Sequence, residues 1–388
     1  MLDKIILSPY YLFLAIRHGM YNKGFILKSK EAEVPTVCIG NITAGGTGKT
    51  PHVEMLLRAL QESDDWGYHN LAVLSRGYKR KSKGFQHVAS GGRALFYGDE
   101  PVQIKKKHPA VTVAVDKNRI EGCRFLCHPD LLQTDKKARK CADKDFAPSE
   151  LIVLDDAFQY RKLKATFNIV LVDYNRPVNK DRLIPFGHLR DLARRIRVAD
   201  AIIITKCPHY MEDGEKAEFL ERLGYREYDP ALCEAKNKKG GVQKVFFTCI
   251  NYQPLVQIYE QGDTRYIYSH KAVLFSGIAK DTPLRMFLSD KYKIVKRFAF
   301  ADHHTFTKSD VRLLEKAAGA CPTAALVTTE KDAQRLVDCS RVSDFLKRKL
   351  FQVPIETAFL SEVEEAVFKA SVLEALRNKN QDYVEQEQ

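Results

Sequence analysis

The sequence lacks the cysteine spacing that marks a disulfide-rich or zinc-binding protein. Its nine cysteines form no CxxC pair, and no apolar segment leads into the small residues of a signal-peptide cleavage site. Reduced thiols in a cytoplasmic compartment are therefore the simplest interpretation. Internal repeats and low-complexity segments are also absent. A content of 45 % hydrophobic and 29 % charged residues is ordinary for a soluble globular protein.

A long apolar run is missing as well. Residues 10–16 are strongly apolar, but charged residues flank them, and the stretch falls short of the roughly 20 apolar residues that a membrane-spanning helix needs. Aromatic residues beside Arg17 and Lys23 suit a helix that lies in a membrane interface. The same spacing also suits an amphipathic helix packed on the domain, so both interpretations stay open.

Acidic residues are in deficit. The chain has 62 lysines and arginines against 49 aspartates and glutamates, a net charge of +13. This balance favours anionic partners such as nucleic acid, phosphorylated metabolites or anionic lipid. The basic clusters are scattered, however, and no interleaving of aromatic and basic residues of the RNA-binding kind stands out. A nucleic-acid-dependent ATPase is therefore disfavoured.

Strand-like segments alternate with helical ones over the first half of the chain. The expected strands are 34–39, 71–74, 111–115, 151–154, 169–172 and 201–204. Such alternation predicts an α/β fold with a doubly wound, mostly parallel sheet. Ligands of these sheets bind at the carboxyl ends of the strands.

The pattern changes near residue 245. Residues 245–250 and 266–269 look like two short strands with a polar turn between them, and a second α/β series follows. The polar end from Asn378 is expected to be frayed. The predicted parts are an N-terminal amphipathic helix over 1–27, a nucleotide-binding core over 28–244, a β-ribbon linker over 245–270 and a smaller α/β domain over 271–388.

The clearest chemical signal is a glycine-rich segment after the first strand. It consists of Thr43, Ala44, Gly45, Gly46, Thr47, Gly48, Lys49 and Thr50. It matches the P-loop pattern GxxxxGK[ST], except that Thr43 replaces the first glycine. The glycines let backbone N–H groups face phosphate oxygens, and a helix starting near Lys49 points its positive end at them. Lys49 is expected to reach the β- and γ-phosphates, and the Thr50 hydroxyl to ligate Mg²⁺. The segment predicts a P-loop NTPase-like nucleotide site.

Two aspartates follow a later apolar strand. Asp155 and Asp156 come directly after residues 151–154, about 105 residues beyond the P-loop. A P-loop enzyme needs a carboxylate on an adjacent strand to hold Mg²⁺ directly or through water. The pair is therefore predicted to serve the metal ion.

The nucleotide base can be judged from one further segment. GTPases read guanine with an Asn/Thr-Lys-x-Asp sequence after a late strand, and Thr205 and Lys206 follow such a strand here. Cys207 and Pro208 come next, without the aspartate. ATP is therefore preferred over GTP.

Two segments could supply a general base for phosphoryl transfer. Asp99 and Glu100 lie in what reads as a tight turn between strands, and residues 302–304 hold an aspartate and two histidines. From the residues alone, a solvated turn and structural histidines are the commoner explanations.

Taken together, these segments resemble the lipid A 4′-kinase (tetraacyldisaccharide 4′-kinase) family of Gram-negative bacteria. The resemblance covers most of the chain, and a small hydroxyl residue at the position of Thr43 is itself a family trait. Ala157 and Tyr160 depart from it, since they stand where glycine and histidine are usual, and insertions lie near 127–148 and 232–241. The motifs occur in order at 40–51, 74–78, 98–101, 154–159, 181–185, 187–190, 276–278, 302–306 and 328–332.

The resemblance implies transfer of the ATP γ-phosphoryl group to the 4′-hydroxyl of a tetraacylated glucosamine disaccharide 1-phosphate. It implies that Asp99 is the catalytic base and that His303, from the second domain, pairs with it. A base divided between two domains implies that the domains close before the reaction. Further substrate-site residues that it implies are Glu100, Arg76, Gln159 and Arg190.

The resemblance also favours the membrane-interface interpretation of the N-terminal helix. It implies a peripheral or monotopic protein at the cytoplasmic face of the inner membrane, where basic residues meet anionic lipid. The scattered basic clusters argue against nucleic acid as a partner, and no obligate protein partner is inferred. The alternative function is a P-loop NTPase switch or metal-insertion protein, which would use water as acceptor and for which the expected Cys/His clusters are absent.

Overall fold

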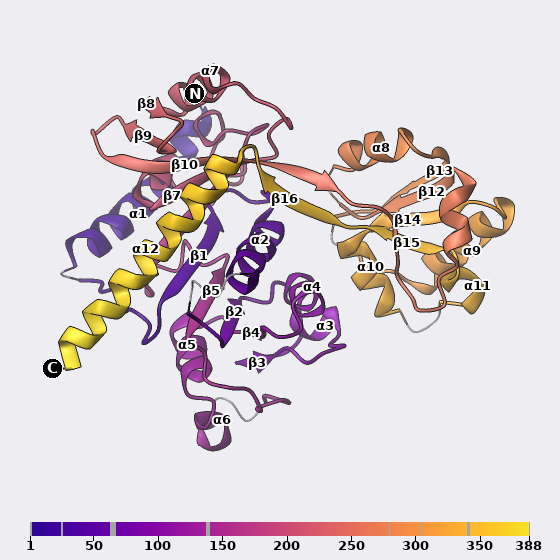
Figure 1. The fold of residues 1–388 in the computed structure, drawn as a ribbon, viewed down its shortest axis with the longest axis horizontal. Helices are drawn as coiled ribbons and strands as arrows, with labels where there is room; N and C mark the ends of the chain where they lie inside the picture. Colours follow the sequence, from indigo (N-terminus) through magenta and orange to yellow (C-terminus); the bar gives the residue numbers. More distant parts are fainter. Residues whose placement is uncertain are drawn as a thin grey trace.

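The computed structural model describes residues 2–24, 26–62, 67–136, 140–278, 280–302, 304–339 and 342–387, with side chains of 9–379 within these ranges. Two sheets organise this part of the chain, a large one of eleven strands and a smaller one of five. Figure 1 shows them as two separate bodies joined by a pair of long strands.

The large sheet is mostly parallel. Its order is β3-β4-β2-β5-β1-β6-β7-β10-β9-β8, with β16 added to β10, and β1 lies between β5 and β6 at the centre. The strands are β1 (Thr36–Asn41), β2 (Leu71–Ser75), β3 (Gln86–His87), β4 (Thr112–Val115), β5 (Leu151–Asp155), β6 (Phe167–Asp173), β7 (Ala201–Thr205), β8 (Tyr225–Asp229), β9 (Glu234–Asn237), β10 (Val242–Tyr252) and β16 (Ile355–Phe359).

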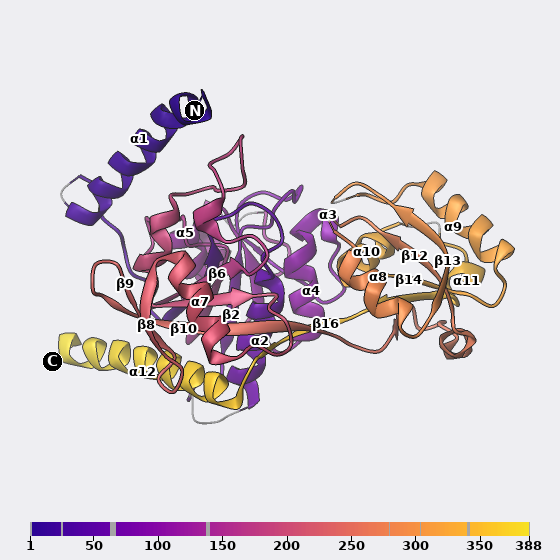
Figure 2. The ribbon, with the colours of Figure 1, turned by 90° about the horizontal axis from the view of Figure 1, so that it is seen from above.

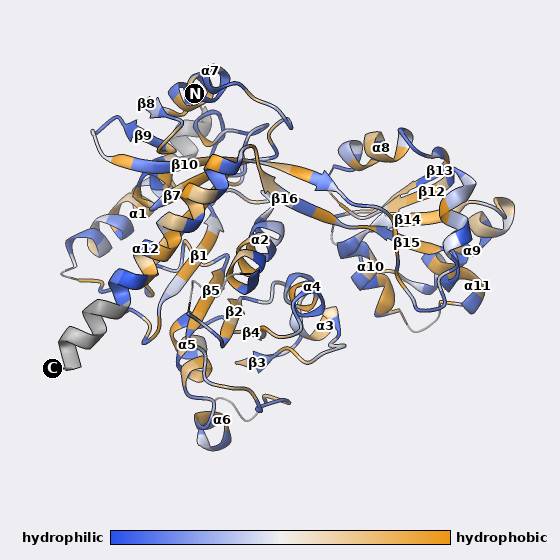
Figure 3. Ribbon diagram, viewed as in Figure 1, coloured by the Kyte–Doolittle hydropathy of each residue, from blue (hydrophilic) through white to orange (hydrophobic). Residues whose placement is uncertain are grey.

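Helices cover both faces of this sheet, which explains why its central strands are mostly apolar (Figure 3). Along β1, Cys38 faces one core and Val37 and Ile39 face the other. The helices around the large sheet are α1 (Leu2–Lys23), α2 (Lys49–Glu62), α3 (Ala94–Tyr97), α4 (Asp99–Lys107), α5 (Arg119–Cys127), α6 (Leu131–Thr134), α7 (Asp213–Leu223) and α12 (Glu362–Glu387). Two 3-10 helices, η3 (Val178–Lys180) and η4 (Ala193–Val198), lie in the connections.

The first and last helices lie on opposite sides of the large sheet, as Figure 2 shows. Leu14 of α1 belongs to the core on one face, whereas Phe368, Val372 and Leu376 of α12 belong to the core on the other. Among the described residues, no helix combines the length and the apolar character needed to cross a bilayer.

The small sheet has the order β11-β15-β14-β12-β13 and its own apolar cores on both faces. Its strands are β11 (Val256–Gln257), β12 (Lys271–Ser276), β13 (Lys293–Ala299), β14 (Ala325–Thr329) and β15 (Leu350–Val353), and its helices are α8 (Thr282–Ser289), α9 (Lys308–Ala320), α10 (Glu330–Val337) and α11 (Asp344–Lys347). The predicted fold class, a P-loop-like α/β sheet with a second, smaller α/β domain and a connecting β-ribbon, is confirmed.

The composition of the ribbon differs from the prediction. β10 pairs antiparallel with β16, from Thr248 opposite Phe359 to Tyr252 opposite Ile355, so its partner comes from about 100 residues later in the chain. The predicted strand at 266–269 was wrong, because these residues belong to the 3-10 helix η5 (Thr264–Ser269). Asp263 explains this turn, since its side chain and carbonyl accept from the backbone N–H groups of Arg265 and Tyr266.

The C-terminal segment also differs. The predicted small domain ran to residue 388, but α12 returns to the large sheet because Phe368, Val372 and Leu376 form an apolar stripe at i, i+4 spacing. The stretch from Asn378, expected to be frayed, continues this helix to Glu387. Consequently the small body is an insertion between β10 and β16.

Candidate nucleotide and catalytic site

The residues between β1 and α2 form a glycine-rich loop at the carboxyl edge of the large sheet. Gly45 and Gly48 have φ angles of +91° and +88°, which L side chains rarely adopt. Because α2 begins at Lys49, its positive end faces the loop. Thr43 pairs with Leu189 in an isolated bridge at the start of the loop. The predicted nucleotide residues thus form a loop that turns at two glycines and ends at a helix N-terminus, the arrangement that phosphate groups favour.

Three side chains that the sequence analysis did not assign to the site hold this loop from behind. Asn41 Nδ2 donates to Thr47 Oγ1 at 2.5 Å, and Thr205 Oγ1 donates to the Thr47 carbonyl at 3.0 Å. Lys206 Nζ donates to the Gly46 carbonyl. Thr205 and Lys206, which resemble half of a guanine-reading motif, therefore support the loop. The sequence did hold a signal for this role, because the two residues lie at the carboxyl end of a buried strand, where ligands of such sheets bind.

A neutral histidine joins the loop to the β-ribbon. His52 Nδ1 donates to the Gly48 carbonyl at 2.7 Å, and its Nε2 accepts from the hydroxyl of Thr248 on β10 at 2.9 Å. Burial lowers the pKa of His52 to about 4, which keeps the ring uncharged near neutral pH. The conformation of the P-loop is thus tied to the strand that leads to the small body.

Asp155 ends β5 beside the P-loop, opposite Ile39 of β1. Its Oδ2 accepts from the Ser75 hydroxyl at 2.8 Å, whereas its Oδ1 is buried and has no hydrogen-bond partner within the described residues. Burial and the nearby charge of Asp156 raise the pKa of Asp155 to about 6. A buried carboxylate oxygen without a donor is a position that a cation or its bound water would fit.

Asp156 has the opposite electrostatic environment. Arg190 donates to both of its oxygens, at 2.8 and 3.1 Å, and Lys49 Nζ lies 3.8 Å from Oδ1. Burial alone would raise the pKa of Asp156, but Lys49 and Arg190 together lower it. Its φ of +52° is an uncommon conformation for aspartate and turns the side chain out of the strand direction. The two adjacent aspartates are therefore not equivalent.

The residues present fit a magnesium ion. Mg²⁺ usually takes one or two carboxylates together with water and substrate phosphates, not a cage made only of protein groups. The described residues contain no cluster of three or more His, Cys, Asp or Glu side chains suited to a metal. Of the two aspartates, Asp155 has the carboxylate oxygen that the described residues leave free, since Arg190 already donates to both oxygens of Asp156.

Asp99 and Glu100 form the first turn of α4, not the predicted tight turn between strands. Gly98, with a φ of +104°, lets the chain leave α3 and start α4 at once. Acidic residues in a first helical turn are favoured by the helix dipole. The charge of Glu100 contributes to raising the pKa of Asp155, so this helix start and the β5 end belong to one site.

The small body reaches these two carboxylates through α10. Arg335 donates to Asp99 Oδ2 from Nε at 2.8 Å and from NH2 at 2.6 Å. Lys331 Nζ donates to Glu100 Oε1 at 2.9 Å. Burial alone would raise the pKa of Glu100, but the Lys331 ammonium lowers it below the usual range. Neither cation was recognised from the sequence, because nothing local marks a partner more than 200 residues away.

Three predicted site residues remain, and they are Gln159, Arg76 and His303. Gln159 Nε2 donates to the Asn41 carbonyl, so it supports the P-loop from the β5 side. Arg76 is exposed and lies close enough to the buried Arg119 to lower the pKa of that guanidinium, together with burial. Arg119 itself donates toward the Asp155 carbonyl at 3.5 Å and was missed. His303 lies outside the described residues.

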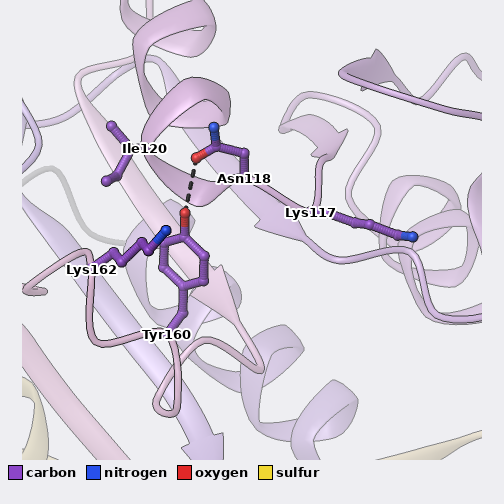
Figure 4. A pocket seen from close by; sticks show the side chains of 5 residues that line it. All are labelled: Lys117, Asn118, Ile120, Tyr160 and Lys162. Carbon is purple, nitrogen blue, oxygen red and sulfur yellow. Dashed lines mark hydrogen bonds between the residues drawn. The ribbon is translucent and has the colours of Figure 1, made fainter. Parts of the chain in front are cut away.

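Tyr160 borders a cavity of about 410 Å³ at the start of α5. Its hydroxyl donates to Asn118 Oδ1 at 2.9 Å, and Figure 4 shows the tyrosine and Asn118 pointing toward each other. The cavity is lined by Lys117, Asn118, Ile120, Tyr160 and Lys162. The departure from the family pattern at Tyr160 therefore places a phenol where an imidazole was expected.

Comparisons with known proteins agree with this geometry. The family model for tetraacyldisaccharide-1-P 4′-kinase matches residues 5–377. The chain belongs to this family. A tetraacyldisaccharide 4′-kinase of Porphyromonas gingivalis is 36 % identical over 385 residues, 97 % of each chain. Another from Phocaeicola vulgatus is 34 % identical over 374 residues, 95 % of this chain and 92 % of that protein.

A solved structure of the family has the same fold. The crystal structure of LpxK from Aquifex aeolicus in complex with ATP superposes with a TM-score of 0.65 at 25 % identity, over 96 % of this chain and 99 % of that one. That protein binds ATP. The sequence also predicted ATP over GTP for this chain, because the aspartate that reads guanine is missing after Lys206. As a member of the tetraacyldisaccharide 4′-kinase family, the protein places its P-loop, aspartate pair and α4 start together at one edge of the large sheet.

Proposed function

We propose that the protein transfers the γ-phosphoryl group of ATP to the 4′-hydroxyl of a tetraacyldisaccharide 1-phosphate, a step of lipid A biosynthesis. The observation that carries this proposal is the convergence of Lys49, Asp155 and the first turn of α4 on one site in a member of this kinase family. Phosphoryl transfer requires mainly positioning and charge stabilisation, and these are the properties that such a site supplies.

The P-loop would hold ATP through its backbone N–H groups, with Lys49 neutralising charge on the β- and γ-phosphates. Lys49 already lies 3.8 Å from Asp156, whose other partner is Arg190. We propose that Asp156 and Arg190 orient Lys49 and the loop, and that Thr50 and Asp155, with Asp156 at longer range, hold Mg²⁺. When bound, Mg²⁺ would shield the phosphate charge that grows in the transition state.

Asp99 is the proposed general base. Its carboxylate would accept the proton of the 4′-hydroxyl while that oxygen bonds to the γ-phosphorus and ADP leaves. We propose His303 as its partner from the small body. A paired carboxylate and imidazole titrate as a coupled unit, so either can hold the proton formally. Closure of the small body would also exclude water, which otherwise competes as acceptor.

Four further residues complete the proposed site. Glu100, held by Lys331, would maintain negative charge beside Asp99. Gln159 and Arg190 both bind Asn41 and would fix the P-loop edge. Arg76 is exposed and adjacent to the site, so we propose that it meets an anionic group of the acceptor.

Helix α1 is the proposed membrane contact. Leu14 and His18 are buried against the large body, whereas Leu12, Phe13 and Ile16 are 58, 59 and 54 % exposed. Large apolar side chains this exposed on one helix face are typical of an interaction surface. We propose that this face enters the lipid interface at the cytoplasmic side of the inner membrane, where the acceptor lipid lies, and that basic residues contact anionic headgroups.

Acceptor dependence distinguishes this kinase from the alternative, an NTPase switch or metal-insertion protein. ADP formation is measured with and without the disaccharide 1-phosphate in mixed detergent micelles. The proposal predicts ADP production only with the acceptor, in a one-to-one ratio with its consumption. ADP production at the same rate without acceptor would favour the hydrolytic switch.

A further inference from the structure

Helix α10 of the small body docks on the large body through charged side chains of both signs. Besides the pairs Arg335–Asp99 and Lys331–Glu100, Glu330 accepts from Lys107 at 2.7 Å. Asp338 accepts from the backbone N–H of Leu95 at 3.0 Å. These contacts join α10 to α3 and α4, so they fix the position of the small body beside Asp99.

Lys107 extends this interface to the P-loop helix. Its ammonium lies 2.9 Å from Glu54 of α2 and 2.7 Å from Glu330, and both carboxylates are almost completely buried. Burial lowers the pKa of Lys107, but the two carboxylates outweigh it and raise the pKa above its usual value. The docked position of α10 is thus coupled to the helix that begins at Lys49.

Arg335 is the most constrained member of this interface. It is 7 % exposed, and its Nε and NH2 groups both donate to Asp99 Oδ2. Its third nitrogen, NH1, donates to Asp332 Oδ1 at 2.9 Å and toward the Gly277 carbonyl at 3.4 Å. A guanidinium held at both ends by planar hydrogen bonds has little freedom, so it fixes the direction of the carboxylate that it contacts.

Asp332, in turn, is fixed by the small body. It is fully buried, and its Oδ2 accepts from the Gly277 backbone N–H at 2.9 Å and from the Thr329 hydroxyl at 2.8 Å. A Cβ on Gly277 would come within 3.1 Å of Asp332 Oδ1 and 3.0 Å of the Ala301 carbonyl. The segments 276–278 and 328–332, to which the sequence analysis assigned no catalytic role, therefore supply the support of Arg335 through Gly277, Thr329 and Asp332.

We propose that Arg335 is a positioning residue for phosphoryl transfer, which holds the Asp99 carboxylate in its reactive orientation when α10 docks on α4. This inference rests on the proposed kinase function with Asp99 as the base. It assigns to Thr329, Asp332 and Gly277 the task of orienting Arg335. A general base displaced by about 1 Å can lose a factor of about 10² in rate, which sets the size of the expected effect.

Steady-state kinetics of Arg335→Gln, Arg335→Ala and Arg335→Lys in the full chain test this proposal. We expect kcat of Arg335→Gln to fall about 10²-fold, with the KM for ATP changed less than about threefold. Arg335→Lys should retain more activity than Arg335→Gln. Millimolar guanidinium should restore part of the activity of Arg335→Ala, since it can occupy the vacated position; a purely structural loss would not respond.

Asp332→Asn provides the second arm, since it keeps the shape of the side chain but weakens its hold on Arg335. If the two residues act as one unit, Asp332→Asn combined with Arg335→Gln should lose no more kcat than Arg335→Gln alone. Arg312→Ala, at an exposed arginine of α9, is the matched control and should behave as the wild type.

Three outcomes would overturn the proposal. Unchanged kcat in Arg335→Gln would show that the contact does not position the base. Increased kcat would show that Arg335 restrains Asp99 instead. Equal losses in all three variants, with no response to guanidinium, would leave Arg335 only a structural role. Failure of the wild type to phosphorylate the disaccharide in the same assay would reject the proposed function itself, independently of Arg335.

Discussion

At the scale of single residues, two adjacent aspartates at the end of β5 behave differently because their neighbours differ. Asp155 is buried and accepts from Ser75, and no cationic side chain among the described residues donates to it, whereas Asp156 is held by Arg190 and approached by Lys49. Two adjacent aspartates in a sequence predict a metal site, but not that one carboxylate stays free while the other pairs with cations. The division depends on which side chain turns toward the cations, and the positive φ of Asp156 determines that.

This difference predicts the stability of an Asp155 variant. Burial raises the pKa of Asp155 from 3.8 to about 6, so the folded protein binds this proton more tightly than the unfolded chain. The stabilisation is complete below about pH 3.8 and is lost as the pH rises through about 6. Asp155→Asn, which carries no charge, should therefore raise the free energy of unfolding at pH 8 without Mg²⁺ by about 1–3 kcal/mol.

Urea denaturation of both proteins at pH 4 and pH 8, with EDTA present, measures this effect. The difference in the free energy of unfolding between Asp155→Asn and the wild type should nearly vanish at pH 4, where Asp155 is mostly protonated in the folded protein. Ser75→Ala, which removes the hydrogen-bond donor to Asp155, serves as a control that should not stabilise the protein. A variant less stable than the wild type at pH 8 would contradict the assigned environment.

At the scale of secondary-structure elements, α1 has two distinct faces. His18 Nε2 donates to Asp191 at 2.6 Å while its Nδ1 accepts from Arg161 at 3.2 Å, so one face is tied to the large body. The other exposes Leu12, Phe13 and Ile16. The choice between a packed helix and an interfacial helix was left open by the sequence, and the structure shows that packing occupies only one face.

Replacing Leu12, Phe13 and Ile16 with serine should weaken binding to anionic vesicles at least tenfold. The reason is that about 0.8 kcal/mol is lost for each CH₂ group no longer buried in lipid. The melting temperature should change little, since these side chains are exposed. Co-sedimentation with vesicles containing phosphatidylglycerol measures the binding.

The matched control replaces three large apolar residues elsewhere on the large body that are about as exposed or more so, Tyr210, Leu232 and Val242, with serine. This control should bind vesicles as the wild type does. Equal binding by the α1 variant and the wild type would exclude the exposed face of α1 as the lipid contact.

The contact between α2 and the ribbon is a second element-scale feature. His52 joins the Gly48 carbonyl to Thr248 of β10, and the hydroxyl of Thr357 on β16 donates to the Pro51 carbonyl at 3.1 Å. Both ribbon strands thus touch the first turn of the helix that follows the P-loop.

His52→Ala should raise the Kd for ATP about fivefold to tenfold. It removes one neutral hydrogen bond that holds the P-loop, worth about 1 kcal/mol, and leaves the Thr248 hydroxyl only the more distant Ile204 carbonyl, at 3.4 Å, as acceptor. Thr357→Val removes a ribbon contact that does not reach a P-loop carbonyl directly, and it should have a smaller effect. Isothermal titration with ATP checks the ranking, and equal affinities in all three proteins would rule out the link.

At the scale of the whole molecule, local sequence patterns predicted those features that depend on neighbouring residues alone. Glycine spacing predicted the P-loop, and the apolar strand before Asp155 predicted the β5 end. Contacts that depend on distant chain pairing escaped prediction: β16 as the partner of β10, α12 on the large sheet, and Arg335 on Asp99. Asn41 and Arg119 escaped for a related reason, because their importance comes from what the fold places beside them.

The insertion of the small body between two paired strands has a functional consequence. β10 leads from the large sheet to the small body and β16 leads back, so one antiparallel strand pair connects the two bodies (Figure 1). We expect bending of this pair to let the small body move while the two cores stay intact. The polar contacts of α10 are expected to stabilise the docked position. We expect the site to be complete only when Arg335 and Lys331 of the small body pair with Asp99 and Glu100 of the large body.

The most direct test of the central claim follows the phosphoryl group itself. The purified protein is incubated with γ-³²P-labelled ATP, Mg²⁺ and tetraacyldisaccharide 1-phosphate, and the lipid product is separated and hydrolysed to locate the label. We predict label on the 4′ position of the disaccharide, and none with Lys49→Ala, which should stay folded because this side chain is partly exposed. Label released only as inorganic phosphate, or unchanged labelling by Lys49→Ala, would contradict the account.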